Sequence, residues 1–203
     1  GKIDTTGSEE NAVGIISLLV KPTSGPSTGY SEAENKGEII AGGTKSTGVY
    51  NTGYFLMDTA AAKITASGNQ SIAVYAKDSD ANTETMLKQG TIEAKSGGVG
   101  LYSDKANITL NDTSGNLKLI ADDSGLLFYN YDSDSTATPA THAGKFTLAT
   151  DVNGTIKSGG VGFYIKDAAV SSGGAITGID TMLDSMFSGN TLSTKMKMDV
   201  QGG

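Results

Sequence analysis

The residues best suited to recognition chemistry are tyrosines that end a short repeated phrase. The phrase occurs six times, and five copies end in tyrosine: Tyr50, Tyr75, Tyr102, Tyr129 and Tyr164. A row of exposed aromatic rings can stack on sugar rings or anchor a protein partner. The row therefore predicts a candidate binding surface, which we call the tyrosine ladder. The plainer interpretation is that these rings pack along an outer face, cover neighbouring glycines and stiffen the structure.

Other side chains give weaker indications of chemistry. His142, the only histidine, stands in a Pro-containing insertion and is expected to be an exposed loop residue without a catalytic partner. Acidic segments at 78–80, 122–123 and 132–134 offer oxygen ligands to calcium, but none follows an EF-hand or the nonapeptide repeat of calcium-binding β-rolls. We expect solvated turns there, with no metal and no cofactor.

The composition excludes several classes of protein. The formal net charge is −7, and Cys and Trp are absent. Every cationic residue is Lys, so clustered arginines for nucleic-acid phosphates are missing. Without Cys, no disulfide or Cys-ligated metal site can form. No acidic column recurs at one position of the repeat, as a polysaccharide lyase or hydrolase would need, so we expect no enzyme activity.

The spacing of the repeated phrase predicts the elements that position the tyrosines. Its last residue falls at 16, 50, 75, 102, 129 and 164, which gives a base period of 25–27 residues and two longer intervals. The extra residues lie in predicted loops at 21–36 and 132–144, which are rich in Pro, Gly, Ser and Asp. Such insertions often form the binding face of a repeat protein, so both loops are also candidates for contact.

One repeat contains three short strand patterns. In the clearest unit these are Val99–Ser103, Asn107–Leu110 and Leu117–Ala121, separated by Asn, Asp and Gly turns. Three strands per repeat are typical of one coil of a right-handed parallel β-helix. We therefore predict an all-β solenoid of about seven coils that occupies residues 1–203 as one segment of a longer rod. Helical patterns are weak; Asp80–Lys88 is a possible exception and Asp180–Phe187 is ambiguous.

Alternation of side chains along a strand predicts which residues face inward. Val49, Val74 and Leu101 are expected inside, with Thr47, Ile72 and the equivalent residues two positions earlier on the same face. The tyrosines are expected outside, flanked mostly by small residues such as Gly48 and Ala73.

Several phrases resemble a known family. Lys157–Tyr164, Ser46–Thr52 and Met182–Gly189 are similar to passenger-domain repeats of large fusobacterial type Va autotransporter adhesins of the RadD-like kind. The resemblance implies export through a C-terminal outer-membrane β-barrel, which this sequence does not include. It also implies a place on the bacterial cell surface and adhesion to a host cell-surface protein or glycan, or to partner bacteria. It carries over no binding residues.

Two functions follow as hypotheses. The first is a surface adhesin segment that extends from the outer membrane and presents contacts. The alternative is a carbohydrate-binding or carbohydrate-active β-helix protein.

Overall fold

The protein is almost entirely β-structure in the computed structural model, which describes residues 1–7, 10–18, 32–77, 83–131, 146–165, 186–187 and 195–201. The strands are β1 (Lys2–Asp4), β2 (Val13–Ser17), β3 (Glu32–Glu34), β4 (Glu38–Ala41), β5 (Thr47–Asn51), β6 (Tyr54–Ala66), β7 (Ile72–Lys77), β8 (Glu84–Ala94), β9 (Val99–Asp104), β10 (Ile108–Leu110), β11 (Leu117–Ala121), β12 (Leu126–Tyr131), β13 (Phe146–Leu148), β14 (Val152–Ile156), β15 (Val161–Ile165) and β16 (Met196–Val200).

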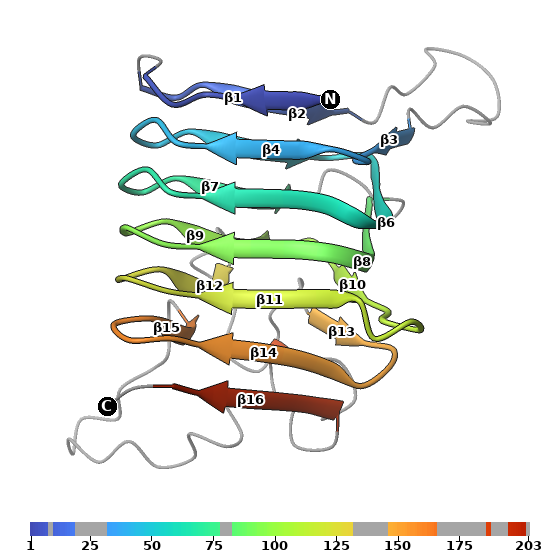
Figure 1. The fold of residues 1–203 in the computed structure, drawn as a ribbon. Coiled ribbons are helices and arrows are strands. Elements are labelled where there is room, and N and C mark those ends of the chain that lie inside the picture. The colour runs from blue at the N-terminus through green and yellow to red at the C-terminus, as the bar shows by residue number, and fades with distance from the viewer. Residues whose placement is uncertain are drawn as a thin grey trace, which may run out of the picture.

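These strands form two sheets. The ten-stranded sheet has the order β1-β4-β6-β8-β11-β14-β16, with β3, β10 and β13 beside this path, and the six-stranded sheet has the order β15-β12-β9-β7-β5-β2. The chain passes from one sheet to the other and back, so each sheet gains a strand at every repeat (Figure 1). All pairings between these named strands are parallel. This arrangement is compatible with the predicted parallel β-helix.

The clearest predicted repeat agrees with the structure. Its three expected strands correspond to β9, β10 and β11, each within one residue of the predicted bounds. The turns that link the two sheets place non-glycine residues at positive φ, among them Lys45 (55°), Gln70 (58°) and Ser96 (53°). Glycines also adopt positive φ in these turns, among them Gly97 (79°) and Gly159 (78°), where the lack of a Cβ makes this conformation favourable.

The helical exception suggested at Asp80–Lys88 is wrong. Glu84–Ala94 is the long strand β8, and residues 80–82 lie outside the described part of the chain. Thr85 and Leu87 are fully buried at alternate positions, and β8 pairs with strands on both sides. Burial in the sheet outweighs a weak local helical pattern. Of the ambiguous segment at 180–187, only Met186 and Phe187 are described, and both are buried.

The predicted loops lie largely outside the described residues. This holds for all of 132–144 and for 21–31 of the first loop. The last residues of the first loop differ from the prediction, because Glu32–Glu34 forms β3 and pairs with Tyr54–Leu56 of β6.

The core depends on two columns of side chains that complement each other across the sheets. In the ten-stranded sheet, one column of paired positions is mostly large: Ile3, Ile39, Ile64, Ile92, Leu119, Gly154 and Met198. In the six-stranded sheet, the residues two positions before the end of the repeated phrase are mostly small. They are Gly14, Gly48, Ala73, Gly100, Leu127 and Gly162. A Cβ placed on Gly48 would lie 2.9 Å from Ile64 Cγ2 and 2.7 Å from the Ala73 carbonyl oxygen. The sheets therefore approach closely where one of them lacks a side chain.

The small residues were predicted to lie outside beside the tyrosines, and this is wrong. Ala73 and Val74 are consecutive and both fully buried, and Leu127 is also fully buried. The pairing registers skip Ala73 and its equivalents, so strict alternation is interrupted there. The residues one position earlier were predicted to face inward. This is wrong for Ile72, which is only partly buried, and for Val161, which is 47% exposed, whereas Thr47 is buried as predicted.

We predict that Gly48→Val lowers the free energy of unfolding by about 1–3 kcal/mol, because the added side chain would overlap Ile64 and the Ala73 backbone. Ile64→Ala alone should cost about 2–5 kcal/mol through the cavity it leaves. Combined, the two changes should cost less than their sum, as measured by chemical denaturation. Gly115→Asn is the matched control, because Gly115 has φ of +72° and open space around it. Additive effects of the two core changes would contradict this packing.

Candidate functional site

The tyrosine ladder is a column of paired positions in the six-stranded sheet. Tyr50 pairs with Tyr75, Tyr75 with Tyr102, Tyr102 with Tyr129, and Tyr129 with Tyr164. The strands that carry these residues lie at successive levels of the sheet; β7, β9, β12 and β15 are labelled in Figure 1. Sequence spacing alone thus identified five residues that the structure brings together.

The rings contact one another in two different ways. Tyr50–Tyr75 and Tyr75–Tyr102 make edge contacts, with ring centroids 5.1 and 4.7 Å apart. Tyr102–Tyr129 and Tyr129–Tyr164 are stacked, with centroids 4.5 and 4.9 Å apart and interplanar angles of 15° and 17°. Four of the rings are partly buried, and Tyr164 is 49% exposed. Because the stacked rings cover one another's faces, much of the aromatic surface is used within the ladder.

Asp104 is the polar centre of the ladder. The Tyr75 hydroxyl donates a hydrogen bond of 3.0 Å to Asp104 Oδ2, and Lys77 Nζ lies 3.9 Å from the same oxygen. Asp104 is only 3% exposed, and its Oδ1 has no hydrogen-bond partner among the residues that the structure describes. A buried carboxylate with one unpaired oxygen carries a free-energy cost that a donor could remove.

This environment changes the acidity of two tyrosines. Burial raises the pKa of Tyr75 above its ordinary value, and the Asp104 carboxylate raises it further because a second negative charge would be repelled. Burial also raises the pKa of Tyr102, with additional contributions from Tyr129 and Asp104. Both groups remain neutral phenols at physiological pH.

Sequence reasoning missed Asp104. The available signal was its place two residues after Tyr102, the tyrosine that ends the repeated phrase. Lys77 and Tyr131 occupy the equivalent places in the neighbouring repeats, and the three residues pair in register. This column holds Lys, Asp and Tyr at adjacent levels, whereas the ladder column holds tyrosine at every level from Tyr50 to Tyr164.

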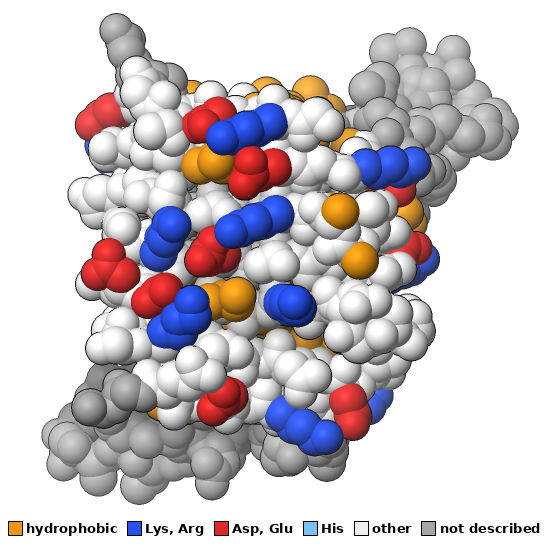
Figure 2. Space-filling view, in the orientation of Figure 1, with side chains coloured by type: hydrophobic (Ala, Val, Ile, Leu, Met, Phe, Trp, Pro, Cys, Tyr) orange, Lys and Arg blue, Asp and Glu red, His pale blue; other side chains and the backbone are white. Residues whose placement is uncertain are grey.

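The outer face of the ten-stranded sheet carries charges of both signs. Figure 2 shows lysines interspersed with acidic side chains across this face rather than a patch of one sign. Lys63 Nζ lies 2.7 Å from Glu93 Oε2, and Lys88 Nζ lies 3.0 Å from Asp58 Oδ2. These charges are thus largely paired with each other across adjacent strands.

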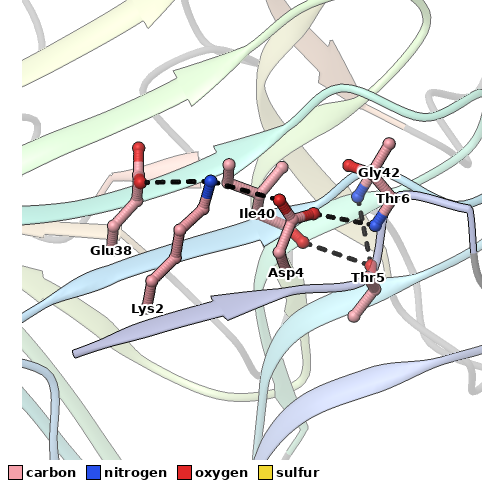
Figure 3. Close-up of polar contacts among 7 residues, drawn as sticks. All are labelled: Lys2, Asp4, Thr5, Thr6, Glu38, Ile40 and Gly42. Carbon is pink, nitrogen blue, oxygen red and sulfur yellow. Dashed lines mark hydrogen bonds and ion pairs between the residues drawn. The ribbon is translucent and has the colours of Figure 1, made fainter.

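The same pairing occurs at the first strand. Figure 3 shows Lys2 between two carboxylates, 3.2 Å from Asp4 and 3.7 Å from Glu38. Asp4 also accepts a 2.9 Å hydrogen bond from the Thr6 backbone N–H, and the Thr5 hydroxyl donates to the Ile40 carbonyl. These contacts hold the turn after β1 against β4. The acidic groups there thus take part in structural ion pairs and hydrogen bonds.

The other polar residues considered from sequence form no site in the described part of the chain. His142 and the acidic segments at 78–80 and 132–134 lie outside it. Asp122 contacts Lys157 at 3.3 Å, and Asp123 accepts a 3.1 Å hydrogen bond from the Ser96 hydroxyl. Within the described residues, no three His, Asp or Glu side chains are grouped to hold a metal ion.

Comparisons with known proteins do not assign a class to this fold and ladder. No family model matches the chain, and no curated protein or solved structure shows significant similarity to it. Nor does any helix in the described ranges have the length and apolar character needed to cross a membrane.

We predict that alkaline pH destabilises the protein partly through Tyr75. In the unfolded chain this phenol releases its proton near pH 10, whereas its raised pKa keeps it protonated in the fold. The unfolded state therefore binds fewer protons above about pH 10, so the free energy of unfolding falls as pH rises. This contribution is fully present at lower pH. Denaturant titrations from about pH 8 to about pH 11 should show a shallower fall for Tyr75→Phe than for the wild type. Parallel curves would show that Tyr75 makes no such contribution.

Proposed function

We propose that the two sheets are walls of a right-handed parallel β-helix. Three observations support this: the chain alternates between the sheets, the named strands pair in parallel, and equivalent residues of successive repeats lie next to one another. A solenoid of this kind grows by adding repeats and forms an extended rod.

We further propose that the chain is a segment of a bacterial cell-surface adhesin. In this proposal it is part of a passenger region exported through the outer membrane by a C-terminal β-barrel outside this sequence. Its role is to extend from the surface and present contacts to host cells or to other bacteria, without catalysis, cofactor or bound nucleic acid. The observation that carries the proposal is the ladder itself, because in-register repeats present the same side chain at every level of a rod.

The contacts in this proposal come from the tyrosine ladder or from the predicted loops at 21–36 and 132–144. Tyr164 is the most exposed ring of the ladder and stacks on Tyr129. It also favours a second candidate, a carbohydrate-binding β-helix protein, because an open aromatic face stacks well on a sugar ring. The other rings suit this less, since their neighbours cover them.

We predict that fluorescent beads coated with the 203-residue protein adhere to epithelial cells or to partner bacteria several-fold more than beads coated with an unrelated acidic protein. If the ladder makes the contact, Tyr129→Ala with Tyr164→Ala should remove most of this adhesion. Tyr54→Ala, on β6 and outside the ladder, is the matched control and should retain it. If the coated beads adhere no better than the control beads to epithelial cells and also no better to partner bacteria, the adhesin proposal is contradicted.

A glycan array distinguishes the second candidate. Binding to defined saccharides that is lost in Tyr164→Ala would favour carbohydrate recognition at the ladder. Cell adhesion without saccharide binding would favour a protein receptor.

A further inference from the structure

We propose that the tyrosine ladder is a site of oxidative cross-linking, at which a carbon–carbon bond joins the rings of Tyr102 and Tyr129 and links two successive repeats covalently. The product is a dityrosine within one chain. This inference concerns the chemistry of the ladder and is independent of the adhesin proposal.

The first support is the contact between the two rings. Tyr102 and Tyr129 occupy paired positions of β9 and β12, so strand pairing holds their backbones at a fixed separation. Their centroids are 4.5 Å apart and their planes differ by 15°. The two rings therefore stack face to face. Tyr131, by comparison, has its centroid 6.3 Å from Tyr102 and is tilted by 58°.

The second support is a proton acceptor at the neighbouring level. Removing an electron from a phenol is much easier when its proton can leave at the same time. The Tyr75 hydroxyl already donates to Asp104 Oδ2 at 3.0 Å, so this carboxylate can take the proton. Its second oxygen accepts no hydrogen bond from the described residues, so the buried anion is poorly stabilised and takes up a proton more readily. Tyr75 lies 4.7 Å from Tyr102, so an electron can pass from Tyr102 to the Tyr75 radical. Tyr75 then takes its proton back from Asp104, and the partly exposed Tyr102 releases its own hydroxyl proton to solvent.

The reaction balances with hydrogen peroxide as oxidant and a haem peroxidase as one-electron carrier. Each of two tyrosines loses one electron and its hydroxyl proton, and peroxide is reduced to two molecules of water. The two tyrosyl radicals then couple through the ring carbons next to the hydroxyl-bearing carbons. The hydrogens on those carbons move to the phenol oxygens as the rings regain aromaticity. The net change in the protein is one new C–C bond and the loss of two hydrogens.

The consequence is a covalent link in a chain that has no cysteine. Between β9 and β12 the repeats are otherwise joined by strand hydrogen bonds and packing. A bond across this interval restricts separation of the two repeats when the rod is pulled or heated. The stacked pair Tyr129–Tyr164 offers the same geometry at the next level, with centroids 4.9 Å apart.

The test uses the intact chain at low concentration, treated with hydrogen peroxide and peroxidase. The monomer is then separated, digested after lysine and analysed by mass spectrometry. Tyr102 lies in peptide 96–105, whereas Tyr129 and Tyr131 both lie in peptide 119–145. We expect these two peptides joined, with the mass of both less two hydrogens, as the main intrachain product containing Tyr102.

Variants assign the linked residue. Tyr129→Phe should lower this product at least tenfold, whereas Tyr131→Phe, which changes the same peptide, should leave at least half of it. Tyr75→Phe should slow product formation several-fold while the same product forms. A control compares the products of the wild type with and without denaturant. The preference for the Tyr102–Tyr129 link should disappear when the protein is unfolded.

Three results would overturn the proposal: the same product yield in denaturant, persistence of the product in Tyr129→Phe, or cross-links only between different chains. An unchanged rate in Tyr75→Phe would remove Tyr75 and Asp104 as the place where oxidation begins. Each variant is first checked for native strand content by circular dichroism. Because the product is also measured in the wild type with and without denaturant, a variant that fails to fold leaves the proposal testable.

Discussion

Parallel, in-register pairing between repeats is the constraint on which the rest of the structure depends. Adjacent strands of a sheet lie about 4.8 Å apart, and in-register pairing places equivalent residues at that spacing. Each side chain therefore meets its own counterpart from the next repeat. A residue type tolerated at one level must be compatible with its neighbours on both sides. The tyrosine ladder follows directly from this rule, because flat rings of one kind can contact one another at such a spacing.

Packing between the two sheets is a second constraint on the side chains. Where one sheet carries a large aliphatic residue, the other is reduced to glycine, as at Ile64 and Gly48. The relation reverses at the level of Leu127, which lies against Gly154. Buried polar residues recur where the chain leaves the six-stranded sheet, as at Asn51, Ser103 and Asn130. Asn51, for example, donates to the Glu84 carbonyl and to the Thr85 hydroxyl, which joins the end of β5 to β8. A repeat can thus vary in sequence while the combined volume and the hydrogen bonds are preserved.

Much of this organisation could be predicted from the sequence, because the spacing of the repeated residues indicates which of them pair in neighbouring strands. The spacing of the phrase that ends in Tyr50 and its counterparts identified the ladder, and turn residues identified the strands of the unit around Leu117–Ala121. The inward place of Gly48 and Ala73 could not be predicted by strict alternation, since the strand is irregular at that position. Asp104 was missed for a different reason: its importance comes from Tyr75 in the preceding repeat, which only the register brings within hydrogen-bond distance.

The central claim, that successive repeats stack in register into a rod, can be tested by a distance measurement along it. The chain has no native cysteine, so Lys2→Cys and Lys197→Cys would carry the only two spin labels. These exposed positions end one column of paired residues that runs through Glu38, Lys63, Thr91, Lys118 and Asn153. Six strand spacings separate them, so pulsed electron paramagnetic resonance should give a narrow distribution centred near about 29 Å, broadened by the label arms. A broad distribution, or one centred below about 15 Å or above about 45 Å, would contradict the in-register stack.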